Sequence, residues 1–214
     1  KARSLLQSIN PSRLDDYDSW LKIGMAAHSV GDDSLLQEWE VLSQKNRPEM
    51  IMAMKDDLMQ VKNIALVTGG ARGIGSASAK ALKEEGFAII IADINKEALA
   101  KTKEELNPLS AVICDMGQPN EVKKLFFHIC EEHGPISALV NNAGVALPGE
   151  FLSYSVEDFE RVLDVNVKGV FLATQLAAKS MIEHDIEGSI VNMSSINAQV
   201  AIPGIPAYCA SKGG

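Results

Sequence analysis

Tyr208 and Lys212 stand four residues apart in the segment YCASK. On a helix this spacing places both side chains on one face. A phenol has an ordinary pKa of about 10, and a neighbouring ammonium group stabilises the phenolate and lowers that pKa. The pair is therefore suited to general acid–base chemistry. Taken alone, the same spacing is also typical of an ordinary amphipathic surface pair.

A glycine-rich segment, TGGARGIG at 68–75, stands between an apolar run and a helix-like pattern. Its glycines would let backbone N–H groups approach a pyrophosphate at a helix N-terminus. Asp93 follows at the end of the second apolar run, close to the interval at which a carboxylate accepts hydrogen bonds from an adenosine ribose. The two signals together predict a dinucleotide cofactor. The alternative is that Asp93 caps the next helix, although Asn95 is available for that role.

Asp93 and Arg72 have opposite consequences for the choice of cofactor. A carboxylate at Asp93 favours the free 2′-hydroxyl of NAD and repels a 2′-phosphate. The guanidinium of Arg72 can instead pair with that phosphate. Because the phosphate would lie against the carboxylate, NAD is the predicted cofactor and NADP is the alternative.

Apolar runs and amphipathic stretches alternate from residue 61 to residue 214. The runs are continuous in Val, Ile and Leu, which indicates strands buried on both faces. Repeated strand–helix units with right-handed crossovers predict an α/β fold, a doubly wound parallel sheet of the Rossmann-like type. The predicted strands cover 63–68, 88–93, 110–115, 136–141 and 188–194, and the predicted helices cover 73–85, 95–105, 118–133 and 155–184.

Residues 1–60 have a different pattern, which predicts a small N-terminal helical segment. Residues 1–45 are predicted to form a helical hairpin with an aromatic seam, and 46–60 a methionine-containing linker to the domain at 61–214. The stretch DDYDSWLKIGMAAHSVGDDSLLQEWEVLSQK resembles part of a helical domain found C-terminal to primases. A helical hairpin unrelated to that domain is the alternative.

The composition argues against several classes of function. Hydrophobic residues make up 46% and charged residues 22%, as in ordinary globular proteins. The net charge of −8 lacks the positive excess that drives binding to nucleic-acid backbones, and the apolar runs are too short to span a bilayer. Neither the histidines nor Cys114, Cys130 and Cys209 have metal-ligand or disulfide spacing. We expect a cytoplasmic protein without a metal site and without membrane or nucleic-acid partners.

Further motifs follow the glycines in a fixed order. They are Asp115 after the third run, NNAG at 141–144, NVKG around Asn166, SS at 194–195 and YCASK at 208–212. Over 61–214 the chain resembles the short-chain dehydrogenase/reductase family. The resemblance implies an NAD(P)-dependent oxidoreductase that transfers a hydride between nicotinamide and an alcohol or carbonyl substrate. It also implies a homo-oligomer.

The resemblance implies a role for each motif residue. Tyr208 is the acid/base, and Lys212 also holds the nicotinamide ribose. Ser195, selected over Ser194 by its spacing from Tyr208, hydrogen-bonds the substrate oxygen, and Asn166 positions a water in the proton path. Asp115 contacts the adenine, and Asn141, Ala143 and Gly144 line the cofactor cleft. The predicted cofactor-binding residues are Thr68, Gly69, Arg72, Gly73, Ile74, Gly75, Asp93, Asp115, Met116, Asn142, Ala143, Gly144, Tyr208 and Lys212.

In this family the chain continues beyond the lysine with further strands and a lid over the substrate. We therefore expect a sheet that is incomplete at the C-terminus, with the fifth strand as an exposed edge. Two other functions stay open, a nucleotide-binding fragment without turnover and a replication-associated, primase-like helical module fused to it. The segment INAQVAIPGIPA at 196–207 predicts an apolar pocket for a small alcohol or ketone.

Overall fold

One parallel sheet forms the centre of the part of the chain that the structure describes. The computed structural model describes residues 63–213, so the predicted hairpin at 1–45 and linker at 46–60 lie outside the described residues. The strand order is β3-β2-β1-β4-β5, and every pair is parallel. The strands are β1 (Ile64–Thr68), β2 (Ala88–Asp93), β3 (Ser110–Ile113), β4 (Ala138–Asn141) and β5 (Ser189–Asn192). The predicted doubly wound parallel sheet is confirmed.

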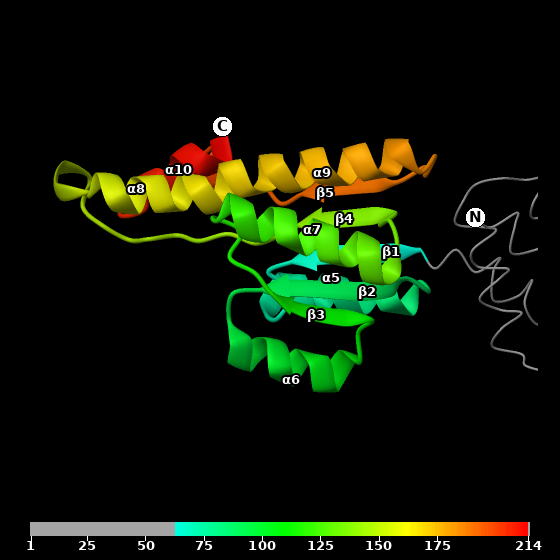
Figure 1. Ribbon diagram of the computed structural model, residues 1–214. Helices are drawn as coiled ribbons and strands as arrows, with labels where there is room; N and C mark the ends of the chain where they lie inside the picture. The colour runs from blue at the N-terminus through cyan, green and yellow to red at the C-terminus, as the bar shows by residue number, and fades with distance from the viewer. Residues whose placement is uncertain (1–62, 214) are drawn as a thin grey trace, which may run out of the picture. The chain divides into compact units, whose positions relative to one another are not determined.

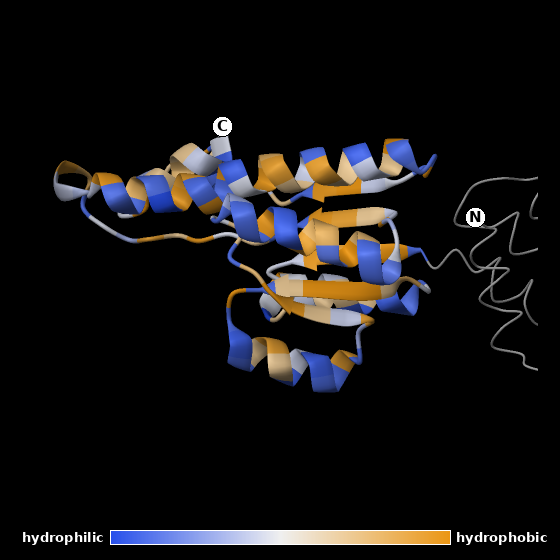
Figure 2. Ribbon diagram, in the orientation of Figure 1, coloured by the Kyte–Doolittle hydropathy of each residue, from blue (hydrophilic) through white to orange (hydrophobic). Residues whose placement is uncertain are grey.

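Helices cover both faces of the sheet (Figure 1). Successive residues of a strand point to opposite faces, so Leu66 of β1 packs in the cluster that includes α7 and α9, and Val67 in the cluster that includes α5 and α6. Figure 2 shows mostly apolar strands at the centre, and helices that carry both apolar and polar residues around them. The helices are α5 (Gly73–Glu84), α6 (Lys96–Leu106), α7 (Pro119–His133), α8 (Val156–Leu163), α9 (Val170–Glu183) and α10 (Pro206–Gly213), with 3₁₀ turns η2 (Phe151–Ser153) and η4 (Ile196–Ala198).

Side-chain caps fix the beginnings of two helices. The Asn95 side chain accepts a hydrogen bond from the Ala98 N–H over 2.8 Å at the start of α6. Ser155 accepts one from the Asp158 N–H over 3.0 Å at the start of α8. Such caps satisfy N–H groups that have no partner within the helix. At the start of α5, by contrast, the side chain of the N-cap residue Arg72 makes no such hydrogen bond.

A π-helical turn, η3 (Asp164–Gly169), joins α8 to α9 in one continuous helical stretch. The sequence predicts uninterrupted helix over 155–184 and does not reveal this wider turn. Gly169 allows the turn to lie close to the segment after β3, since a Cβ there would stand 2.3 Å from the Met116 carbonyl oxygen. Turns of this kind are found often at functional sites, and this one carries Asn166.

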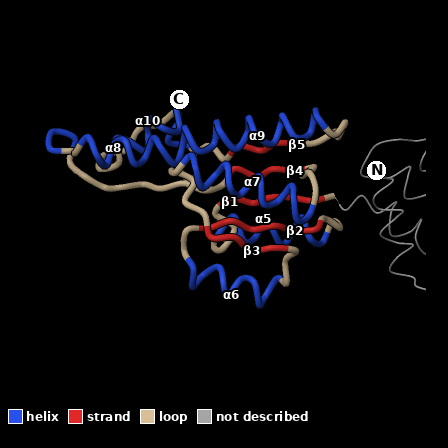
Figure 3. Tube along the Cα trace, in the orientation of Figure 1, coloured by secondary structure: helices blue, strands red, loops and turns tan. Residues whose placement is uncertain are grey.

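The direction of strand addition reverses between β1 and β4. The chain proceeds from β1 outward to β2 and β3, then crosses back to β4 and β5 on the other side of β1 (Figure 3). The loops after β1 and β4 therefore leave the carboxyl edge of the sheet in opposite directions. In open parallel sheets a crevice at this position is where ligands bind.

β5 forms one edge of the sheet, beside α9 in Figure 1. Val191 in its middle is 51% exposed, which agrees with the expectation of an exposed fifth strand. Among residues 63–213, no helix combines the length and the apolar character needed to cross a membrane.

Candidate active site

The turn between β1 and α5 depends on glycine at two kinds of position. Gly69 and Gly73 have φ of 62° and 52°, in the left-handed region that residues with a Cβ rarely adopt. Gly75 has a different constraint, since a Cβ there would lie 2.1 Å from the Gly69 carbonyl oxygen and 2.5 Å from Asn142 Nδ2. The sequence TGGARGIG thus folds into a tight turn that packs against the loop after β4.

Thr68 and Asn142 tie the ends of β1 and β4 together. Thr68 Oγ1 accepts hydrogen bonds from the N–H groups of Asn142 and Ala143 over 3.1 and 3.2 Å. The Asn142 amide nitrogen donates to the carbonyl oxygens of Thr68 and Gly69 over 3.1 and 3.0 Å. Both predicted residues therefore shape the crevice, and Thr68 does so from a buried position.

Asp93 lies at the carboxyl end of β2, and its side chain is nearly buried at 8% exposure. One carboxylate oxygen accepts a hydrogen bond from the Ala71 N–H over 3.1 Å and the other from the Asn95 N–H over 2.9 Å. Asn95, not Asp93, caps α6, so the capping alternative for Asp93 does not hold. Asp93 instead links the glycine turn to the loop after β2.

A cavity opens at the carboxyl edge between these loops. It brings together eight of the predicted cofactor-binding residues, namely Gly69, Arg72, Asp93, Asp115, Met116, Asn142, Ala143 and Gly144. Thr68, Gly73, Ile74 and Gly75 are not among its lining residues; they form the adjoining end of β1 and start of α5. The sequence did not single out five others that line it, namely Ile94, Cys114, Val145, Arg161 and Val165.

Arg161 is the charged residue among these five. It lies on α8, and its Nη2 and Nη1 reach the two carboxylate oxygens of Asp115, each over 3.0 Å. The Gly117 N–H donates to the same carboxylate over 2.9 Å. A lone arginine in a helix has no sequence signal for such a role, because the pairing spans 46 positions of the chain.

Cys114 also lines this cavity, but its thiol is 2% exposed. Burial, with the nearby carboxylates of Glu121 and Asp115, raises the pKa of Cys114 to about 12. The neutral thiol is a weak nucleophile, so Cys114 acts as a packing residue.

Asn166 holds the loop after β4 from its place in the π turn. Its Oδ1 accepts from the Val145 N–H over 2.8 Å, and its Nδ2 donates to the Val145 carbonyl oxygen over 2.9 Å. The same nitrogen lies 2.9 Å from the Ser211 hydroxyl, which donates to the Tyr208 carbonyl oxygen over 2.8 Å. Asn166 thus joins the cofactor side of the crevice to α10.

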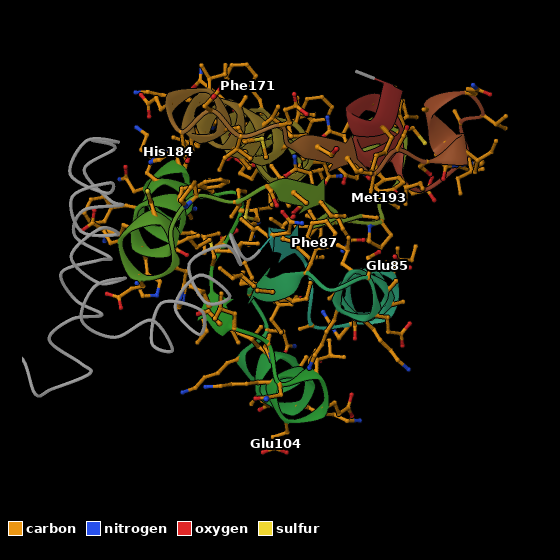
Figure 4. The ribbon with its side chains drawn as sticks, turned by 90° about the vertical axis from the view of Figure 1, so that its right-hand side faces the viewer. Glu85, Phe87, Glu104, Phe171, His184 and Met193 are labelled. Atoms are coloured by element: carbon orange, nitrogen blue, oxygen red, sulfur yellow. The ribbon has the colours of Figure 1, made fainter. Side chains whose placement is uncertain are left out.

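Tyr208 and Lys212 share one face of α10, as the spacing predicts. Lys212 Nζ lies 5.8 Å from the centre of the Tyr208 ring and donates to the Met193 carbonyl oxygen. Figure 4 shows Met193 beside α10, after the end of β5. Burial lowers the pKa of Lys212 below its ordinary value. Lys212 and Asn166 line a second cavity together with Ser194 and Ser211.

Ser195 begins the short η4 turn, which packs against α10. Its hydroxyl accepts from the Asn197 N–H and donates to Asn197 Oδ1, both over 3.2 Å. Neither Ser195 nor Tyr208 is among the residues that line the two cavities. Of the two serines, Ser194 lines the second cavity.

Asn141 does not line the cofactor cleft as expected. It is 2% exposed, and its amide nitrogen donates to Thr174 Oγ1 and Asn192 Oδ1 over 3.0 and 2.8 Å. It therefore joins β4 to β5 and α9 inside the protein. Asn141 points to the same side of β4 as Leu139, into the interior toward α9, whereas Asn142 follows the end of the strand and lines the cavity.

The residues of the first cavity fit a dinucleotide. The start of α5 has no side-chain cap and no acidic residue in its first turn, so its N–H groups are free to receive an anion. The missing Cβ atoms at Gly69 and Gly75 keep the backbone close to the crevice. Arg72 contributes a positive charge and Asp93 a carboxylate to the lining of the cavity.

A parallel sheet with a glycine turn at its switch point, followed by Tyr208 and Lys212 on α10, is the arrangement of a short-chain dehydrogenase. The family model described as "short chain dehydrogenase" matches residues 63–214. The chain belongs to the short-chain dehydrogenase family.

Several curated proteins are similar to the chain. It is 38% identical over 149 residues to carbonyl reductase (NADPH) 2 of Sus scrofa, covering 70% of this chain and 59% of that protein. It is 35% identical over 155 residues to the 3-oxoacyl-(acyl-carrier-protein) reductase FabG of Thermotoga maritima, covering 71% and 63%. It is also 35% identical over 155 residues to short-chain dehydrogenase reductase 3a of Arabidopsis thaliana, covering 70% and 59%. The chain spans about three fifths of the length of these relatives.

A second family model, described as "Primase C terminal 2 (PriCT-2)", matches residues 2–54. This agrees with the resemblance of the front segment to a helical domain found C-terminal to primases. The match ends within the predicted linker at 46–60.

Proposed function

We propose that the chain provides the cofactor-binding and acid–base parts of an NAD-dependent oxidoreductase that acts on an alcohol or carbonyl group. The observation that carries this proposal is the cavity at the switch between β1 and β4, which brings the glycine turn and Asp93 together. The order of Tyr208 and Lys212 on α10 supports the acid–base part.

The nicotinamide group, when bound, supplies or accepts the hydride. The chain's own residues hold the cofactor and handle the proton. The free N–H groups at the start of α5 would receive the pyrophosphate, and Asp93 would accept the ribose hydroxyls. Asp115, held by Arg161, would contact the adenine.

Tyr208 would give its phenolic proton to the carbonyl oxygen in the reductive direction and take it back in the oxidative direction. The Lys212 ammonium lies 5.8 Å from the centre of the Tyr208 ring and adds positive charge beside it. Asn166 would keep α10 in register with the crevice through Ser211. Ser195 would donate to the substrate oxygen after releasing Asn197.

Asp93 supports NAD over NADP, because a 2′-phosphate would meet its carboxylate. One relative is named for NADPH, carbonyl reductase (NADPH) 2 of Sus scrofa. Replacement of Asp93 by Ser should shift the ratio of the two dissociation constants toward NADP. An unchanged ratio would overturn the assignment of Asp93.

The reaction is tested by titration of the full chain with NAD, followed by hydride transfer to a panel of ketones. Tyr208→Phe should bind NAD as the wild type does and transfer hydride at least about a hundredfold more slowly, which is the range of one general acid. Binding without transfer in the wild type would favour the second candidate, a nucleotide-binding fragment without turnover. That candidate is supported because Gly69 to Val145 supply most of the cavity lining by themselves.

Two further features belong to the same proposal. The apolar segment at 196–207, with Val200 and Ile202 exposed, favours a hydrophobic alcohol or ketone as substrate.

Self-association through α9 is supported by Phe171 and Ile182, which are 64% and 80% exposed. Figure 4 shows Phe171 on the outer side of α9. Sedimentation of the wild type against Phe171→Glu tests this, and a monomeric wild type would contradict it.

A further inference from the structure

Asp115 is fixed from three directions at the wall of the first cavity. The Arg161 guanidinium binds both of its oxygens, and the Gly117 N–H binds one of them. A carboxylate offers about four lone-pair positions. Three are occupied, so one directional acceptor position remains.

Gly117 makes this arrangement possible. A Cβ at that position would lie 2.4 Å from Arg161 Nη1 and 3.3 Å from Asp115 Oδ1. The Arg161 guanidinium therefore occupies the space that a side chain at position 117 would fill. The contact is not an ordinary exposed ion pair, because the Asp115 side chain is 18% exposed and the Arg161 side chain 33%. By comparison, the Lys179–Glu183 pair on α9 has exposures of 70% and 56%.

We propose that Arg161 is a positioning residue that holds Asp115 as a rigid acceptor for the amino group of adenine, and so makes the site selective for that base. This inference rests on the proposed function, in which Asp115 contacts the adenine. A rigid carboxylate accepts from an amino donor. The same carboxylate repels a carbonyl oxygen that takes the place of the amino group on the base, because a carboxylate fixed by Arg161 cannot rotate away from that oxygen.

Two dinucleotides that differ at this one group test the proposal, NAD and nicotinamide hypoxanthine dinucleotide. In the second, a carbonyl oxygen replaces the amino group. The dissociation constants of both are measured by fluorescence titration on the full chain. The wild type should prefer NAD by about tenfold or more, the size expected for a hydrogen bond to a charged group.

In Arg161→Met the carboxylate is free to rotate, so the preference should fall at least about fivefold, mainly through better binding of the hypoxanthine form. Gly117→Ala keeps both charges but displaces the guanidinium, and it should lower the preference in the same direction. Arg161→Lys should restore part of it. Lys179→Met removes an exposed positive charge and should leave the preference as in the wild type.

The outcomes separate the two proposals. If the wild type binds neither dinucleotide, both the proposed function and this inference fail. If it binds both with no preference, or if Arg161→Met and Gly117→Ala weaken both equally, the function stands and the positioning role of Arg161 is overturned. An unfolded Arg161→Met is recognised by circular dichroism, and Gly117→Ala then decides.

Discussion

The side-chain amide of Asn166 donates a hydrogen bond to the hydroxyl of Ser211 over 2.9 Å. Ser211 in turn donates to the backbone carbonyl of Tyr208 over 2.8 Å. A residue in the π turn thus reaches, through one hydroxyl, the backbone of the helix that carries the acid–base pair. Ser211 is buried, so neither bond is replaced by water at the surface.

Replacement of Ser211 by Ala should lower kcat about tenfold with little change in the KM for the cofactor, because α10 loses its link to Asn166 while the first cavity is intact. The free energy of unfolding should fall by about 1 kcal/mol, the typical net value of a hydrogen bond. Steady-state kinetics and urea titration measure the two effects. Ser153→Ala is the control, since that exposed hydroxyl makes only a 3.5 Å contact with the Glu150 carbonyl oxygen. Equal kinetic effects of the two variants would contradict the link.

Gly75→Ala should destabilise the protein by about 1–3 kcal/mol, the usual cost of overpacking. The new methyl group would meet the Gly69 carbonyl oxygen at 2.1 Å, and backbone cannot yield as a flexible side chain does. Urea unfolding followed by circular dichroism measures the loss. Gly213→Ala in α10 is the matched control, because its Cβ would make an ordinary 3.5 Å contact, and it should stabilise slightly. A Gly75→Ala variant as stable as the wild type would contradict the close approach of position 75 to the Gly69 carbonyl oxygen.

The three cysteines should react with iodoacetamide in an order set by exposure and pKa. Cys130 is exposed and should be alkylated first at pH 8. Cys114 is buried, and its pKa of about 12 keeps the thiol neutral there. Peptide mapping of partly alkylated protein gives the order, and unfolding in urea should make Cys114 as reactive as Cys130. Rapid labelling of Cys114 in the folded protein would refute its burial.

Lys212 should make stability depend on pH in the alkaline range. Its pKa is lowered in the folded protein by burial, so between that pKa and the ordinary value of 10.5 the unfolded chain binds more protons than the folded one. The contribution of Lys212 to the free energy of unfolding therefore rises with pH across this window. The difference between wild type and Lys212→Met, measured by urea unfolding from pH 7 upward, isolates the effect from other titrating groups. A difference that stays constant to about pH 10.5 would exclude a lowered pKa.

The central strands could be predicted because β1, β2 and β4 are continuous apolar runs that are buried on both faces. β3 and β5 lie at the edges of the sheet and are more exposed. The predicted ends of the strands were less accurate than their centres. The run at 110–115 leaves the ladder after Ile113, since Cys114 and Asp115 begin the loop that shapes the cavity. The glycine turn at 68–75 and the carboxylate of Asp93 could be predicted because their roles depend on residues close to them in the sequence.

Other features depend on contacts between distant parts of the chain. The Arg161–Asp115 pair joins α8 to the segment between β3 and α7, where Gly117 leaves room for the guanidinium and Gly169 for the approach of η3. That Asn141 meets Asn192 follows from the register of β4 and β5, which the motif NNAG does not specify. The π turn itself leaves the helical pattern of 155–184 almost unchanged, so its wider turn could not be predicted.

That wider turn sets the rotational phase of everything after it. An α-helix advances about 100° per residue, so deletion of a single residue between Asp164 and Gly169 would rotate all of α9 by roughly that angle about its axis. The buried row at Ala173, Ala177 and Met181 would then leave the sheet, and the exposed Phe171 side would turn toward it. Within this stretch, insertions and deletions are therefore far more harmful than substitutions, and the length of the segment matters as much as its composition.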